Sequence, residues 1–156
     1  MISKGKLYLF IERVPLRTHQ ILRKELANGK KVLYISKNAP ELLRSQLNFE
    51  PKKLHIKWLN PRPRNDCIPP MNLALFEYYV DNFIKENKNC IVVLNGIEVL
   101  QMWNGFVPVL KILKNVKNKI NTNCISMLIS IDPKTQFENQ LNLLQSISDE
   151  VISSYT

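Results

Sequence analysis

Four short apolar runs constrain the fold of this chain more than any other feature of its sequence. They lie at residues 6–12, 31–36, 91–95 and 124–131 and are rich in β-branched and aliphatic residues. Runs of this length without polar alternation are typical of strands buried on both faces of a parallel sheet. The stretches 72–87 and 106–120 instead carry apolar residues at helical spacing. The alternation predicts a three-layer α/β fold, with a mostly parallel sheet of about five or six strands and helices on both faces.

Length and composition indicate one domain that spans residues 1–156. The 156 residues are 45% apolar and 22% charged, which is ordinary for a globular protein. No apolar run approaches the ~20 residues of a membrane span, and the run at 7–11 is too short for a signal peptide, so we expect a cytoplasmic protein. Cys90 and Cys124 begin predicted strands and are expected in the core. The cysteines and histidines lack metal-ligand spacing, so we expect no metal or cofactor.

The positive charge is concentrated in the first part of the chain. Residues 1–64 contain 15 Lys or Arg against 4 Asp or Glu, whereas residues 65–156 contain 7 against 9. Such asymmetry is found on surfaces that bind nucleic acid or another polyanion, but it is also typical of a solvated, lysine-rich surface. If the surface binds an anion, the candidate contacts are Arg13, Arg17, Trp58, Arg62 and Arg64, with Trp58 available to stack on a base.

The segment after the first strand lacks the residues of a phosphate-binding loop. Such a loop needs glycines that let the backbone wrap the phosphates, followed by Lys and Ser or Thr. The chain has no glycine between Lys6 and Asn28, and bulky residues fill the loop at 13–17. Thr18 is the one residue that could be a remnant, and it is also a suitable cap for the helix that follows. His19 is expected at the surface.

Three polar residues follow other strands and are candidates for a vestigial nucleotide site together with Thr18. Asn95 ends the run at 91–95, at the place where a nucleotide hydrolase carries an aspartate for magnesium. Glu98 could act as a general base or simply favour a helix N-terminus. Asp132 could likewise only cap the turn that starts at Pro133. No nucleophile–base arrangement or carboxylate pair is present, so we assign no catalytic residue and expect no enzymatic activity.

Several segments resemble an archaeal family of unknown function, DUF-835, which is related to the RecA/KaiC-like P-loop nucleotide hydrolases. They include YLFIE, KVLYISKNAPELL, MNLALFEYYVDNFI, IVVLNGIEVLQMWNGFVPVLKIL and MLISIDPKTQFENQLNLLQ. The resemblance implies a RecA-like core in which 91–95 corresponds to the Walker B strand and 124–131 lies between it and the first strand. The chain departs from the hydrolases at both decisive positions, since it lacks the glycine–lysine loop and has Asn95 in place of the aspartate. Glu98 matches the position at which the family has an acidic residue.

Three functions are compatible with the sequence. The first is a non-catalytic RecA-like domain that binds a protein partner or itself. The second is a nucleic-acid-binding module that uses the basic N-terminal part, whose affinity would fall steeply with salt. The third is a residual nucleotide-binding protein or hydrolase that uses Glu98 and Asp132. We favour the first, because both motifs that hydrolysis requires are altered.

Overall fold

The apolar runs of the sequence form strands of one sheet in the computed structural model, which describes residues 2–154. Within these residues the sheet has seven strands, and all neighbouring strands are parallel. The strands are β1 (Leu7–Ile11), β2 (Val32–Ser36), β3 (Leu54–Leu59), β4 (Cys67–Ile68), β5 (Ile91–Asn95), β6 (Ser126–Ile131) and β7 (Glu150–Ser153). Their order across the sheet is β4-β3-β2-β5-β6-β1-β7.

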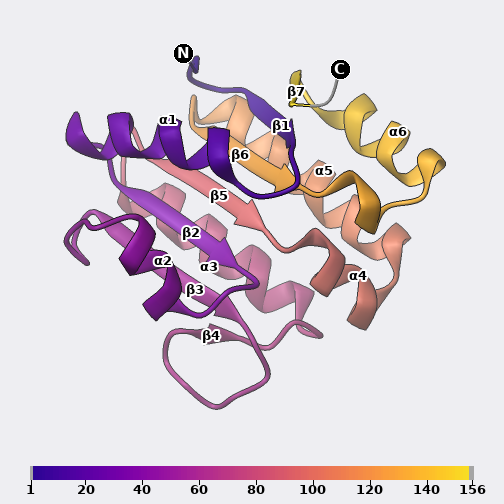
Figure 1. Cartoon of the computed structure of the whole chain (residues 1–156), viewed down its shortest axis with the longest axis horizontal. Helices are drawn as coiled ribbons and strands as arrows, with labels where there is room; N and C mark the ends of the chain where they lie inside the picture. The colour runs from indigo at the N-terminus through magenta and orange to yellow at the C-terminus, as the bar shows by residue number, and fades with distance from the viewer. Residues whose placement is uncertain (1, 155–156) are drawn as a thin grey trace.

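Helices cover both faces of this sheet, as a parallel sheet requires (Figure 1). They are α1 (Leu16–Ala27), α2 (Pro40–Gln46), α3 (Leu73–Glu86), α4 (Ile97–Asn104), α5 (Phe106–Thr122) and α6 (Glu138–Ile147), with a 3₁₀ turn, η1 (Pro133–Thr135). Residues of α1 and α2 pack with Tyr8 and Tyr34 on one face. Residues of the other four helices pack with Leu9 and Val92 on the opposite face. The predicted three-layer α/β fold is confirmed.

The strand at 91–95 is the centre of the sheet. β5 is the fourth strand in the order, all five of its residues are buried, and it pairs with β2 on one side and β6 on the other. β6 lies between β1 and β5, the arrangement that the family resemblance implied. A buried strand with two parallel neighbours tolerates no alternation of polar residues, which explains the uniformly apolar run.

The structure corrects two expectations and makes a third, that of a mostly parallel sheet, more definite. The sheet has one or two more strands than predicted, because the proline-rich segment at 60–70 contains the two-residue strand β4, which pairs with Trp58 and Leu59 of β3. It is also wholly parallel among the described residues. Cys124 is exposed and has a positive φ of 55°, so it belongs to the turn before β6 and not to the core. Cys90 is buried as expected.

Candidate functional site

Polar residues gather where the parallel strands end, which is called here the carboxyl edge of the sheet. Glu12 follows β1, Ser36 ends β2 and Asn95 ends β5. Ser36 and Asn95 are direct neighbours in the register of β2 and β5. Open α/β sheets bind their ligands at this edge. These side chains and their neighbours therefore define the candidate site.

Glu12 places a carboxylate at the N-terminal end of α1. The residue comes directly after β1 and is only 3% exposed. Its Oε1 accepts a hydrogen bond of 2.9 Å from the backbone N–H of Arg17. Its Oε2 accepts hydrogen bonds from the hydroxyl groups of Thr18 at 2.5 Å and Ser130 at 2.8 Å. The carboxylate thus satisfies a free N–H of the first helical turn and lies at the positive end of the helix dipole.

The carboxylate of Glu12 lies at the junction of a strand, a loop and a helix N-terminus, a kind of junction that binds phosphate in other α/β proteins. A phosphate at this junction would meet a negative charge and a backbone donor that is already used. The chain therefore carries an internal anion at this position. Part of this arrangement could be seen in the sequence, where a single acidic residue stands between an apolar strand and a helix with Thr18 in its first turn. The contact with Ser130 could not, because Ser130 belongs to a strand that is distant in the sequence.

Thr18 does not cap its helix, contrary to expectation. α1 begins at Leu16, and Pro15 is the residue at its N-cap position. Thr18 is fully buried, and its hydroxyl donates to Glu12 instead. The N-cap thus lies three residues earlier than predicted, and Thr18 and His19 fall on the same buried face as Leu22 and Leu26.

A neutral buried network lies next to this junction. His19 is 4% exposed, so the expectation of a surface histidine is wrong, and its Nε2 lies 2.7 Å from the hydroxyl of Tyr34. Burial, assisted by the charge of Arg23, lowers the pKa of His19 to about 4, and burial raises the pKa of Tyr34. Asn95 lies against the Tyr34 phenol without a well-formed hydrogen bond, and its Nδ2 has no partner among the described residues. The amide supplies no charge to hold a metal ion.

The two acidic candidates have partners that fit structural roles. Glu98 lies in the first turn of α4, and its Oε2 is 2.9 Å from the Nζ of Lys37, which follows β2. The other oxygen of Glu98 is buried and has no partner among residues 2–154. Asp132 accepts a hydrogen bond of 3.0 Å from the backbone N–H of Lys134 and caps η1. Glu98 therefore joins β2 to α4, and Asp132 stabilises its own turn.

The residues proposed for anion contacts are partly engaged within the chain. Arg13 and Arg17 are exposed beside the start of α1, and only the backbone of Arg17 contacts Glu12. The guanidinium groups of Arg62 and Arg64 lie over the ring of Trp58, at 5.5 and 5.4 Å from the centroid.

Further contacts hold these side chains in place. Trp58 donates to the backbone oxygen of Lys37. Arg64 forms ion pairs of 2.6 Å with Asp66 and 3.3 Å with Glu41. Trp58, Arg62 and Arg64 thus already contact one another within the chain.

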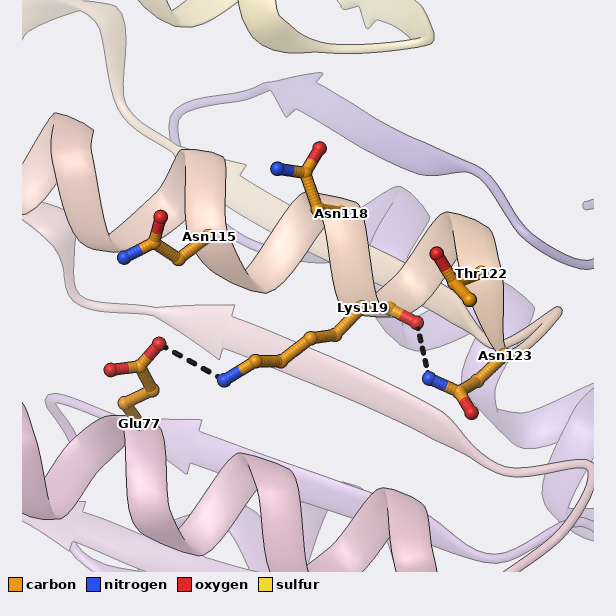
Figure 2. Close-up of a pocket in the computed structure, with 6 residues that line it drawn as sticks. All are labelled: Glu77, Asn115, Asn118, Lys119, Thr122 and Asn123. Carbon is orange, nitrogen blue, oxygen red and sulfur yellow. Dashed lines mark hydrogen bonds and ion pairs between the residues drawn. The ribbon is translucent and has the colours of Figure 1, made fainter.

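A separate hollow of about 450 Å³ lies between α3 and α5 (Figure 2). Figure 2 shows Lys119 of α5 reaching toward Glu77 of α3. The Nζ of Lys119 lies 3.1 Å from Glu77 and 2.7 Å from Asp81. The single positive charge of Lys119 therefore offsets one of the two negative charges of Glu77 and Asp81, of which Glu77 lines this hollow.

Neither a cluster of metal-ligating side chains nor a membrane-spanning helix occurs among the described residues. Within residues 2–154, no three His, Cys, Asp or Glu side chains are grouped so that they could hold a metal ion. In the same range, every helix is too short or too polar to cross a bilayer.

The relatives of the chain identify its family. The model of a family described as "Protein of unknown function (DUF835)" matches residues 14–147. The chain belongs to the DUF835 family. This membership confirms the resemblance seen in the sequence. A comparison of the DUF835 chain with curated proteins yields no match.

Solved structures with the same fold come from the archaeon Pyrococcus horikoshii OT3. A KaiC-like protein matches with a TM-score of 0.72 and 14% identity, over 96% of the DUF835 chain and 72% of its own. A second protein from the same organism, from a structural study, matches with a TM-score of 0.66 and 12% identity, over 97% and 83% of the two chains. At these identities the matches show the KaiC-like, RecA-related fold alone.

Proposed function

We propose that this DUF835 chain is a non-catalytic RecA-like domain that acts by contacting a protein partner or a second copy of itself. The observation that carries the proposal is the carboxylate of Glu12, which takes the backbone N–H of Arg17 at the N-terminus of α1. A RecA-like hydrolase needs that helix end for the phosphates of its nucleotide. A degenerate phosphate loop is part of this proposal, as is a cytoplasmic location.

The electrostatics of the junction argue against nucleotide binding. A triphosphate would have to displace a buried carboxylate from three hydrogen bonds before it reached the helix N-terminus. Asn95 supplies no charge for magnesium, and the carboxylate of Glu98 is paired with Lys37. The third function, a residual nucleotide-binding protein, is therefore not favoured by any of these contacts.

Calorimetric titration with magnesium and ATP tests the loss of nucleotide binding. The wild-type chain is expected to give no binding heat up to a ligand concentration of several millimolar. Saturable binding with a Kd below about 1 mM that is lost in Glu98→Gln would overturn the proposal, because it would show a working site at the carboxyl edge.

Exposed apolar side chains support a role in protein contact. Met102 and Trp103 at the end of α4 are 77% and 50% exposed, Val107 at the start of α5 is 67% exposed, and Phe137 before α6 is 76% exposed. One residue joins α4 to α5, and a hydrogen bond between Gln136 and Gln101 ties the Phe137 segment to α4. Grouped apolar exposure of this kind is typical of surfaces that other proteins cover.

A photocrosslinking amino acid at position 107 tests this surface. We expect crosslinks at Val107, either between purified copies or to a discrete partner in cells, and their loss when Trp103 is changed to serine. The matched control is the same amino acid at Lys114, which is exposed on the same helix. The proposed contact surface would be ruled out if, both with purified copies and in cells, crosslinking at position 107 were no stronger than at position 114. Sedimentation of the purified chain distinguishes self-association from a separate partner.

A further inference from the structure

Six lysines without partners gather at the amino edge of the sheet, where the parallel strands begin. Lys4 precedes β1, Lys31 precedes β2, and Lys88 lies just before β5. No side-chain hydrogen bond or ion pair engages any of the six among residues 2–154. These amino-edge lysines are Lys4, Lys31, Lys52, Lys53, Lys85 and Lys88.

The amino-edge lysines line two hollows on either side of the C-terminal end of α3. One hollow, of about 570 Å³, is lined by Lys4, Lys85 and Lys88 together with the turn before β6. The other, of about 550 Å³, is lined by Lys31, Lys52 and Lys53. Lysines from the basic residues 1–64 thus lie at the same edge as lysines from the second part of the chain. The edge lies at the tails of the arrows in Figure 1, opposite α4.

The negative groups near this edge do not cancel the positive charge of its lysines. Lys6 and Lys30 are paired with Glu150 and Glu25, so they contribute little. Two acids that line the second hollow, Glu50 and Glu86, have no ion pair among the described residues. The C-terminal ends of α1, α2, α3, α5 and α6 also face this edge, each with about half a negative charge. Together these groups offset roughly three quarters of the charge of the six lysines.

We propose that the amino edge binds the phosphate backbone of duplex nucleic acid. From β3 to β1 the sheet order crosses four strand spacings, so the row of lysines extends for roughly 19 Å at about 4.8 Å a strand. Duplex DNA carries one negative charge per ~1.7 Å, so this row is matched to a polyanion and exceeds the size of a single phosphate. Lysines on separate strand ends of one rigid sheet hold this spacing without further folding.

The composition of the edge favours nucleic acid over the other polyanions that a cell contains. No large exposed apolar side chain lies in its loops, at 2–6, 28–31, 48–53, 85–90 or 121–125, which leaves nothing to insert into a membrane. Protein interfaces are depleted in lysine and enriched in Tyr, Trp and Arg, which these loops lack as exposed residues. Lysine contacts to phosphates carry no sequence information, so the binding is expected to be sequence-independent.

Fluorescence anisotropy with a labelled 20-base-pair duplex, measured from 50 to 200 mM salt, tests the proposal. The variant changes Lys31, Lys52 and Lys88 to alanine. Each lost phosphate contact should reduce the slope of log K against log salt by about 0.9, hence by about 2.7 for three, and the affinity at 0.15 M salt by roughly 100-fold. Circular dichroism spectra and unfolding midpoints, which surface lysines should leave unchanged, show whether the variant is folded.

The matched control changes three exposed lysines elsewhere, Lys111, Lys114 and Lys134, to alanine and alters the net charge equally. It should retain most of the affinity and the slope of the wild-type chain. The proposal is overturned if the wild-type chain does not bind the duplex at 50 mM salt, or if the two variants lose affinity equally. Binding of vesicles with anionic lipid in preference to the duplex would also overturn it and assign the edge to a membrane.

Discussion

Changing Glu12 to glutamine would remove the negative charge at the N-terminus of α1 and keep the size of the side chain. The carboxylate accepts three hydrogen bonds in the folded protein, from Arg17, Thr18 and Ser130. Hydrogen bonds to a charged group are about twice as strong as neutral ones, so neutralisation costs about 0.5–1 kcal/mol for each bond. The helix dipole adds about 0.3–1 kcal/mol, and the cheaper burial of an amide offsets about 1 kcal/mol.

The expected net loss is about 2 kcal/mol of unfolding free energy, which corresponds to a fall in Tm of about 4–8 °C for a chain of this length. Urea unfolding at pH 7, followed by circular dichroism, measures it. Glu41→Gln is the matched control, because Glu41 also lies in the first turn of a helix but is exposed. A loss for Glu12→Gln below 0.5 kcal/mol, or equal to that of the control, would refute the assignment of Glu12 as an internal anion.

A second variant separates the charge of Glu12 from its hydrogen bonds. Glu12→Ala leaves the donors of Arg17, Thr18 and Ser130 without their acceptor and opens space for an external anion. We expect inorganic phosphate at 50 mM to raise the unfolding free energy of this variant by about 1 kcal/mol if it binds with a Kd near 10 mM. The wild-type chain, and sodium chloride at equal ionic strength, should show no such gain. Equal stabilisation of both proteins would contradict the reasoning.

Three further predictions concern the surroundings of the site. Because the folded pKa of His19 is about 4 and lies below its unfolded value, the wild-type chain should lose roughly 2 kcal/mol more stability between pH 7.5 and 5 than His19→Gln, as measured by urea unfolding. Gly96→Ala should cost about 1–3 kcal/mol by the same method, because its Cβ would lie 2.8 Å from Leu59. Cys124 alone should react quickly with a thiol reagent in the folded protein, since Cys67 and Cys90 are buried.

Each of these predictions has a control within the chain. A parallel pH dependence of His19→Gln and the wild type would show that the histidine does not titrate as described. Gly29→Ala shares a positive φ with Gly96 but meets no atom within 4 Å, so equal losses for the two variants would argue against crowding at Gly96. Replacement of Cys124 by serine should abolish the rapid thiol reaction, and a reaction that persists would place an accessible thiol elsewhere.

The core of the fold could be predicted from local sequence, because a strand that is buried on both faces consists of a continuous run of apolar residues. The run at 91–95 contains no polar residue before Asn95, and this alone indicates a strand in the centre of a parallel sheet. β4 could not be predicted in this way. It lies among prolines and owes its two residues to contacts with β3 and with the residue that follows β3, such as the hydrogen bond from the Asn60 N–H to the Ile68 oxygen.

The candidate site was only partly predictable, because its decisive contacts join distant parts of the chain. Asn95, Glu98 and Asp132 could be found, since each follows a recognisable strand. The role of Glu12 depends on Ser130, which is 118 positions away, and no local pattern encodes that contact. The burial of His19 extends the inner face of Leu22 and Leu26 by one turn, and its partner Tyr34 comes from a separate strand that no local pattern indicates.

The position of β1 between β6 and β7 also has a consequence for the synthesis of the protein. Leu7 pairs with Met127 and Tyr8 with Glu150, so β1 has no neighbour in the sheet until β6 and β7, which follow much later in the chain, have been synthesised. Until then both of its edges are unpaired, and such edges promote association with other unfinished chains. A fragment of residues 1–64 would hold β1 with neither neighbour. The basic part of the sequence is therefore not a folding unit, and experiments with nucleic acid require the whole chain.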